Sequence, residues 1–257
     1  MGKTINVYWT RHGLSCSNMA TAAAFRKIGC VKNEYKQVKK SEFTKWVEYP
    51  RDSFLTNIGK EHCVKIAEQL NINFDLILSS SLIRSIQTAD EFSKNLSKCK
   101  DRNIYIVPYI QELGTSSNGN TGRTLQHLKT LLTSNKIESN IFIIGKNKMF
   151  LEPSNLTKFT NILKSVADKS NNKHINLLVI SHGGFMKHNL TNKKVSNLEI
   201  WKQVWKYDNN KLIAHLPKKF SDGIGKQRSS KYYCNPENFG LNEKTFHKTL
   251  SECNWKL

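Results

Sequence analysis

Near its start the chain reads Ile5-Asn6-Val7-Tyr8-Trp9-Thr10-Arg11-His12-Gly13. The first five residues predict a short strand, because most of them are apolar or favour β-structure. A second apolar run, over 175–180, leads in the same way into Ser181-His182-Gly183-Gly184. Each strand therefore carries a histidine, followed by glycine, to its C-terminal end, which is the edge where open α/β sheets bind ligands. With Arg11 beside the first histidine, the two strands predict a site for an anion.

Alternating strands and helices are expected along the rest of the chain. Further strands are predicted at 74–78, 104–107, 141–144 and 211–215, and helices at 17–28, 56–70, 82–92, 125–132, 156–167 and 184–190. Ser79-Ser80-Ser81 is expected to cap the helix that follows it, as Thr56 caps its own helix. This order is typical of an α/β fold in three layers, with a mainly parallel central sheet and helices on both faces.

The pattern indicates one core, so we expect a single domain over residues 1–217. Two stretches interrupt it: a basic and aromatic insertion over 26–51, and a variable region over 114–155 that begins with a loop of Gly, Asn, Ser and Thr. A basic extension follows over 218–257, packed on the domain or trailing from it. Long loops inside compact domains are usually functional or mobile, and we expect the insertion to act as a lid that selects a strongly anionic substrate.

The composition indicates a protein that attracts anions. Its 257 residues carry a formal net charge of +20, which favours phosphorylated metabolites, nucleic acid or acidic lipid, although a drift toward lysine and asparagine codons is an alternative origin of the charge. No apolar run reaches the roughly 18 residues of a membrane helix and no export signal is recognised, so we expect a cytoplasmic protein without membrane contact. The six cysteines lack CxxC or zinc-type spacing and are expected to be reduced thiols. The oligomeric state is not predicted.

Five short motifs follow one another along the chain. They are Arg11-His12-Gly13-Leu14-Ser15-Cys16-Ser17-Asn18, Leu55-Thr56 with Gly59, residues 79–89 (SSSLIRSIQTA), Glu112-Leu113, and Ser181-His182-Gly183-Gly184. In kind and order they resemble the signatures of the histidine phosphatase superfamily, in its phosphoglycerate-mutase-like branch. The resemblance spans most of 5–190 and leaves out the insertion, the variable region and the C-terminal extension. It implies the phosphoglycerate-mutase-like fold and a phosphoryl-transfer site with no metal and no cofactor.

The resemblance implies roles for the residues around the first histidine. His12 would be the nucleophile that attacks phosphorus and forms a phosphohistidine. Neighbouring cations would lower the pKa of its imidazole and so keep it unprotonated, and its other ring nitrogen is expected to donate to a backbone carbonyl. Arg11 and Arg84 would clamp the phosphate, because one guanidinium can hold two phosphate oxygens.

The other motif residues complete the expected site. His182 would donate to a phosphate oxygen, and Gly183 would let the helix terminus approach the anion. Glu112 would be the general acid, which requires a raised pKa; the alternative is an exposed loop residue. Ser15 and Asn18 either bind the phosphate or cap the first helix, and the sequence favours neither. For the two histidines the alternative is a structural role, which the full set of motifs makes the weaker interpretation.

The predicted reaction is the hydrolysis of a phosphomonoester. Cofactor-dependent mutases carry an Arg and a Tyr after the acid (ERHYG), whereas this chain has Glu112-Leu113-Gly114-Thr115-Ser116, so a phosphatase is favoured over a mutase. The expected partner is a small phosphorylated molecule, such as a sugar bisphosphate, nucleotide or inositol phosphate, or a phosphoprotein. Two rivals remain: a basic nucleic-acid-binding protein on an inactive phosphatase scaffold, which no nucleic-acid motif supports, and a scaffold that binds phosphorylated partners without turnover.

Overall fold

A central sheet organises the chain in the computed structural model, which describes residues 2–28, 30–31, 34–35, 52–113, 125–134, 137, 139–144, 155–224 and 235–253. Its strands are β1 (Lys3–Arg11), β4 (Leu76–Ser79), β5 (Ile104–Ile106), β6 (Ile141–Ile143), β7 (His174–Ser181), β8 (Ile200–Asp208), β9 (Lys211–Ala214) and β10 (Lys218–Ser221). They lie in the order β10-β8-β1-β7-β4-β5-β6, and β9 also pairs with β8.

The sheet is mainly parallel, as predicted. β1, β7, β4, β5 and β6 run parallel to one another. β8 pairs antiparallel with β1, and β9 and β10 pair antiparallel with β8. The sequence pattern did not indicate β8 or β10. In β8, buried aromatic residues such as Trp201 and Trp205 alternate with partly or fully exposed lysines, so the strand lacks the continuous apolar run that marks the inner strands.

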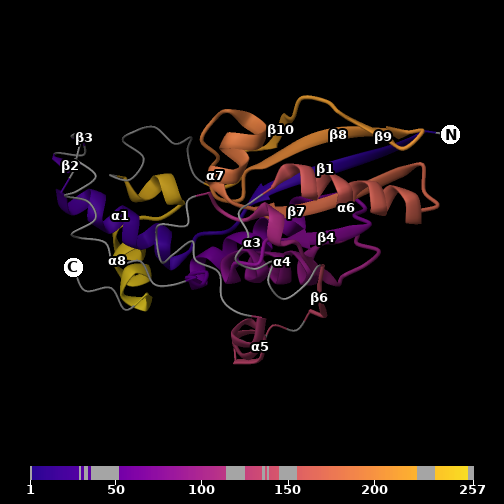
Figure 1. The fold of residues 1–257 in the computed structure, drawn as a ribbon. Coiled ribbons are helices and arrows are strands. Elements are labelled where there is room, and N and C mark those ends of the chain that lie inside the picture. Colours follow the sequence, from indigo (N-terminus) through magenta and orange to yellow (C-terminus); the bar gives the residue numbers. More distant parts are fainter. Residues whose placement is uncertain are drawn as a thin grey trace.

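Helices cover both faces of this sheet (Figure 1). They are α1 (Cys16–Ile28), α3 (Asn57–Gln69), α4 (Ile83–Asn95), α5 (Leu125–Ser134), α6 (Leu156–Lys169), α7 (Gly183–Met186) and α8 (Glu243–Glu252), with shorter turns η1 (Pro108–Ile110), η4 (Lys187–Thr191) and η6 (Pro236–Phe239). α6 packs on the face of β1 that carries Val7 and Trp9, whereas α3 and α4 pack on the face that carries Tyr8. Successive side chains of a strand point to opposite faces, so β1 separates two apolar layers and the three-layer prediction is confirmed.

Two helix starts were predicted from hydroxyl side chains, and one prediction is wrong. Thr56 caps α3, where its Oγ1 accepts a hydrogen bond from the backbone N–H of Gly59 at 3.0 Å. The predicted serine cap of α4 is not made, because the N-cap residue is Leu82, which forms no side-chain cap. Instead Ile83 N donates to Asp52 Oδ1 at 2.8 Å. A cap that comes from 31 positions earlier in the chain cannot be recognised from the local sequence.

Described parts of the C-terminal extension pack on the rest of the protein. The first residues of the extension form β10, and α8 packs on α1, where Cys16 and Cys253 form a disulfide. The prediction that all six cysteines are reduced thiols is therefore wrong for this pair. A separation of 237 residues hides the pairing from any spacing pattern. Cys63 and Cys99 are free thiols, and the cytoplasmic location stays a prediction.

The two stretches that interrupt the domain are only partly described. The insertion was expected from residue 26, but α1 continues to Ile28, and the short strands β2 (Cys30–Val31) and β3 (Glu34–Tyr35) pair with each other after it. The other residues of the expected lid (29, 32, 33 and 36–51) and the loop at 114–122 lie outside the described residues. The boundaries of the domain and of its extension stay predictions. Among the described helices, none is long and apolar enough to cross a membrane.

Candidate active site

Both predicted histidines lie at the same edge of the sheet. β1 and β7 are parallel neighbours whose register pairs Arg11 with Ser181, so His12 and His182 follow at equivalent positions. Their ring centroids are 5.1 Å apart, and both side chains are buried, with exposures of 2% and 0%. The structure therefore brings the two imidazoles together, close enough to contact one tetrahedral anion.

Of the two predicted arginines, one contacts the His12 ring and the other lies beside the glycine that follows His182. Arg84, in the first turn of α4, donates from Nε to His12 Nε2 at 3.1 Å. Arg11 donates from Nη1 to the carbonyl of Val195 at 3.1 Å. The Arg11 guanidinium also lies beside Gly183, where a Cβ atom would stand only 3.1 Å from Arg11 Nε. Glycine at this position makes room for Arg11, a reason for the motif that the sequence did not reveal.

Burial and positive charge keep both imidazoles neutral. The pKa of His12 lies well below its ordinary value, first because the ring is buried and then because Arg84, His182 and Arg11 surround it. Burial, Arg84 and Arg11 lower the pKa of His182 in the same way. His12 Nδ1 lies 2.7 Å from the carbonyl oxygen of Gly13, which can only accept. Nδ1 therefore carries the ring proton, and Nε2 keeps a lone pair that accepts from Arg84.

Serines hold the second histidine, and the sequence did not single them out. His182 Nε2 lies 2.7 Å from Ser80 Oγ and 3.2 Å from Ser85 Oγ. Its Nδ1 is buried and has no hydrogen-bond partner in the described part of the chain. A serine hydroxyl that donates to Nε2 places the ring proton on Nδ1, where it can serve an anion.

Other motif residues hold the loop that follows β1. Gly13 N donates to Thr88 Oγ1 at 3.0 Å. Thr56 donates to the carbonyl of Leu14 from both its backbone N–H and its hydroxyl, at 3.0 and 3.1 Å. Gly59 permits this approach, because a Cβ atom there would stand 2.2 Å from Leu14 O. Helices α3 and α4 thus fix the loop together, which explains threonine and glycine at these motif positions.

Ser15 and Asn18 form a reciprocal cap at the start of α1. Asn18 N donates to Ser15 Oγ at 3.4 Å, and Ser15 N donates to Asn18 Oδ1 at 3.2 Å. This arrangement is a capping box. Of the two interpretations of the sequence, the structure shows the helix cap, and phosphate binding by these residues stays a prediction.

Glu112 lies at the rim of the site, beside α7. Its Oε1 accepts from the backbone N–H groups of Leu113 at 3.0 Å and Phe185 at 3.2 Å. Burial lowers the pKa of Arg84, and the carboxylates of Asp52 and Glu112 oppose that effect. The carboxylate of Glu112 is thus fixed in place and acts on one of the two guanidinium groups.

Gly184 tests the position of Glu112, because a Cβ atom at residue 184 would stand 2.3 Å from Glu112 Oε1. Gly184→Ala must displace the carboxylate. If Glu112 is the general acid that the motifs imply, we expect this substitution to lower kcat about 100-fold for alkyl phosphates, whose leaving oxygen needs a proton. The loss should be much smaller for p-nitrophenyl phosphate. Gly2→Ala is the matched control, since its Cβ would meet nothing closer than 3.5 Å. An equal loss on both substrates would contradict the role of Glu112.

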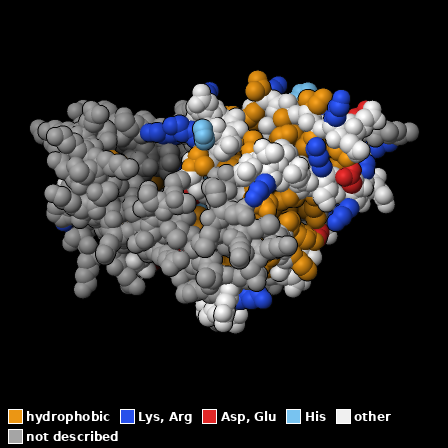
Figure 2. Space-filling view, in the orientation of Figure 1, with side chains coloured by type: hydrophobic (Ala, Val, Ile, Leu, Met, Phe, Trp, Pro, Cys, Tyr) orange, Lys and Arg blue, Asp and Glu red, His pale blue; other side chains and the backbone are white. Residues whose placement is uncertain are grey.

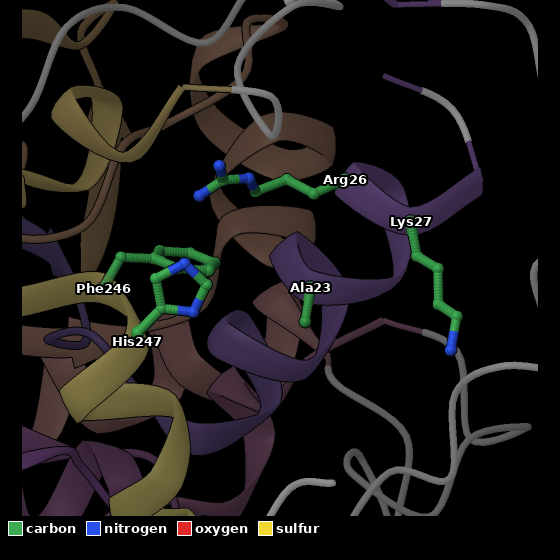
Figure 3. Close-up of a pocket in the computed structure, with 5 residues that line it drawn as sticks. All are labelled: Ala23, Arg26, Lys27, Phe246 and His247. Atoms are coloured by element: carbon green, nitrogen blue, oxygen red, sulfur yellow. The ribbon is translucent and has the colours of Figure 1, made fainter. Parts of the chain in front are cut away.

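A separate hollow of about 380 Å³ lies between α1 and α8 (Figure 3). It is lined by Ala23, Arg26, Lys27, Phe246 and His247. Arg26 forms two hydrogen bonds with Glu243, both of 2.9 Å, and lies over the ring of Phe246. The hollow contains none of the predicted site residues and is not the candidate active site.

Among the described residues, no group of three or more His, Cys, Asp or Glu could hold a metal ion.

Comparison with known proteins yields matches of fold only. No model of a protein family and no curated protein matches the chain. The fold is similar to that of the protein histidine phosphatase SixA, with a TM-score of 0.44 and 11% identity, over 83% of this chain and 96% of that one. The ecdysone phosphate phosphatase of Bombix mori matches with a TM-score of 0.46 and 12% identity, over 87% of this chain and 97% of that one. A mycobacterial glucosyl-3-phosphoglycerate phosphatase matches with a TM-score of 0.45 and 12% identity, over 87% of this chain and 99% of that one.

Each of these solved structures is named as a phosphatase. At such low identities the likeness concerns the fold, and the chemistry of this chain has to be argued from its own residues.

Proposed function

We propose that the protein is a phosphomonoester hydrolase that works through a phosphohistidine on His12. The observation that carries this proposal is the state of that imidazole. Its Nδ1 is tied to the carbonyl of Gly13, and its Nε2 lone pair faces Arg84. A buried, neutral imidazole with a fixed tautomer meets the requirement for a nucleophile. A phosphate that binds here accepts hydrogen bonds from the Arg84 guanidinium in place of His12 Nε2. The Nε2 lone pair is then free to attack phosphorus.

In the first step, His12 Nε2 attacks phosphorus, and the bond between phosphorus and the ester oxygen breaks. Glu112, which is protonated when a phosphate dianion is bound beside it, gives its proton to the leaving oxygen. Arg11, Arg84 and the Nδ1–H of His182 stabilise the charge on the equatorial oxygens of the transferring group. The products of this step are the free alcohol and the phosphohistidine.

In the second step, water attacks the phosphohistidine, and the electron pair of the phosphorus–nitrogen bond returns to His12 Nε2. Glu112 takes a proton from the attacking water and regains its initial state. Inorganic phosphate leaves, and the site is ready for another turnover. The residues named here account for both steps.

The substrate is proposed to be a small phosphorylated metabolite or a phosphoprotein, in keeping with the net charge of +20. A mutase is the second candidate, less favoured because the run after Glu112 lacks the ERHYG residues of such enzymes. On the face shown in Figure 2, lysines and arginines are spread over the described surface and are not gathered in one patch.

The test is a phosphatase screen over a panel of phosphorylated metabolites and phosphopeptides, with trapping of labelled phosphoenzyme. We expect turnover, and a phosphoenzyme that is labile in acid and stable in base. His12→Ala should abolish both, whereas His188→Ala, at an exposed histidine, should leave both intact. Turnover that survives His12→Ala would refute the mechanism. Salt-sensitive binding to nucleic acid without any turnover would favour the rival class.

A further inference from the structure

We propose that Asn197 is a positioning residue for His12, which it orients by holding the backbone carbonyl that the imidazole is bonded to. The inference deepens the proposed function and rests on it for its catalytic consequence. Asn197 lies in the segment between η4 and β8, and no sequence motif marks it.

One side-chain amide connects three acceptors around the nucleophile. Asn197 Nδ2 donates to the carbonyl of His12 at 2.8 Å, to the carbonyl of Gly13 at 3.0 Å, and to Asn18 Oδ1 at 3.2 Å. The Gly13 carbonyl is also the partner of His12 Nδ1, at 2.7 Å. An unbroken chain of hydrogen bonds therefore runs from the Asn197 amide through one peptide group to the imidazole.

The segment that carries Asn197 is fixed to the strand that carries the nucleophile. Leu198 N donates to the carbonyl of Arg11 at 3.0 Å, and the carbonyl of Val195 accepts from the Arg11 guanidinium at 3.1 Å. Ser196 N donates to Glu199 Oε2 at 2.9 Å. Leu198 has a φ of 59°, a left-handed conformation that is costly for leucine and that the surroundings must impose.

The opposite side of this segment is packed equally closely. Gly223 has a φ of 69°, and a Cβ atom there would stand 2.6 Å from the carbonyl oxygen of Asn197. Only glycine fits both the conformation and the space. Asn197 itself is 5% exposed. The backbone of Asn197 is thus closely packed on this side, while its side-chain N–H groups donate to the loop after β1.

The Gly13 carbonyl has to be held in place, because none of the charged groups near His12 can replace it as the acceptor for Nδ1–H. The charged and titratable groups around His12 are Arg84 from α4, Arg11 from β1 and His182 from the end of β7. The two guanidinium groups have no acceptor atom, so they cannot replace the Gly13 carbonyl as partner for Nδ1–H. If that carbonyl turned away, the ring could rotate or exchange its tautomer, and Nε2 would lose its alignment with the phosphate.

The test replaces Asn197 by leucine, which has nearly the same shape and no donor. We expect Asn197→Leu to lower kcat about 100-fold with little change in KM. Asn197→Ser, which keeps one donor, should recover part of the loss. Asn6→Leu is the matched control, because the Asn6 amide donates to Asn176 Oδ1 at 2.9 Å, on a part of the sheet remote from the histidines.

Nuclear magnetic resonance of histidine-labelled protein measures the Nδ1–H signal of His12. A purely structural role of Asn197 would leave this signal unchanged. The Nδ1–H signal of His12, assigned by its loss in His12→Gln, should exchange slowly in the parent protein and broaden or vanish in Asn197→Leu. An unchanged signal in a folded Asn197→Leu protein would overturn the inference. If the parent protein hydrolyses no substrate, the proposed function fails, and this signal still tests the positioning of the ring.

Discussion

Replacing Arg84 by glutamine is expected to lower kcat/KM for a phosphomonoester about 10³-fold, equivalent to about 4 kcal/mol of transition-state stabilisation. Arg84 is 3% exposed, and its Nε lies 3.1 Å from His12 Nε2. In the proposed mechanism it is therefore the cation next to the attacking nitrogen, and it would contact the phosphoryl group as the new bond forms. Glutamine keeps a hydrogen-bond donor near His12 but loses the positive charge and the bidentate hydrogen bonding of the guanidinium.

The same substitution is also expected to raise the pKa of His12 and so to change the pH dependence of kcat/KM. Arg84 is one of the groups that lower the pKa of His12, after burial. Without it the pKa of His12 rises toward its ordinary value. Since the unprotonated ring is the nucleophile in the proposed mechanism, we expect activity to be lost at a higher pH on acidification. The acid limb of the kcat/KM profile, which reports the free enzyme, should therefore move to higher pH in Arg84→Gln. Titration of the substrate affects both proteins equally and cancels in the comparison.

Arg102→Gln is the matched control for both effects. Arg102 is an exposed arginine that donates to the backbone carbonyl of Leu96 at 2.9 Å, just after the C-terminal end of α4. It should keep parental kcat/KM and an unchanged acid limb. If Arg84→Gln retained more than a tenth of the activity while remaining folded, Arg84 would not be the phosphate clamp.

Local patterns were sufficient to predict the parallel half of the sheet and the meeting of its two histidines. An apolar run such as 175–180, followed by Ser, His and Gly, is typical of a buried strand, whose C-terminal end lies at the ligand edge of a parallel sheet. That rule places His12 and His182 at the same edge, and the neighbouring positions of β1 and β7 bring the two rings together. The register of β1 and β7 then determines which residues stand beside each other.

The parts that sequence did not predict depend on contacts between distant segments. Asp52 caps α4, Asn197 holds the loop after β1, and Ser80 and Ser85 hold His182. Each of these polar residues is buried, and its partner lies far away in the chain. Their role is visible only when helices and strands have been placed, because periodicity reports which face is buried and not which polar atom lies there.

The disulfide is the clearest case of such a contact, and its loss should have the largest effect on stability. Cys253→Ser opens a bridge between residues 237 positions apart, so we expect the free energy of unfolding to fall by about 3–5 kcal/mol. For a chain of this size that corresponds to a decrease in Tm of about 10 °C. The bridge anchors α8, whose Phe246 and Leu250 pack with Met19 of α1.

The measurement is denaturant unfolding with and without a reducing agent. The parent protein should be destabilised by reduction to the level of Cys253→Ser, and Cys253→Ser should not respond to it. Cys99→Ser, at a free thiol, is the matched control and should behave as the parent does. A parent protein insensitive to reduction would show that the bridge does not form in solution or does not stabilise the fold.

Activity at low temperature should survive Cys253→Ser, and the reason is the way the loop after β1 is held. Cys16 lies only four positions after His12, yet the hydrogen bonds that fix this loop come from Thr56, Thr88 and Asn197. None of these residues belongs to α8. Opening the bridge therefore weakens the packing of α8 on α1 without removing a bond that orients the imidazole. A loss of kcat in parallel with the loss of stability would mean that the C-terminal helix contributes to the alignment of the nucleophile.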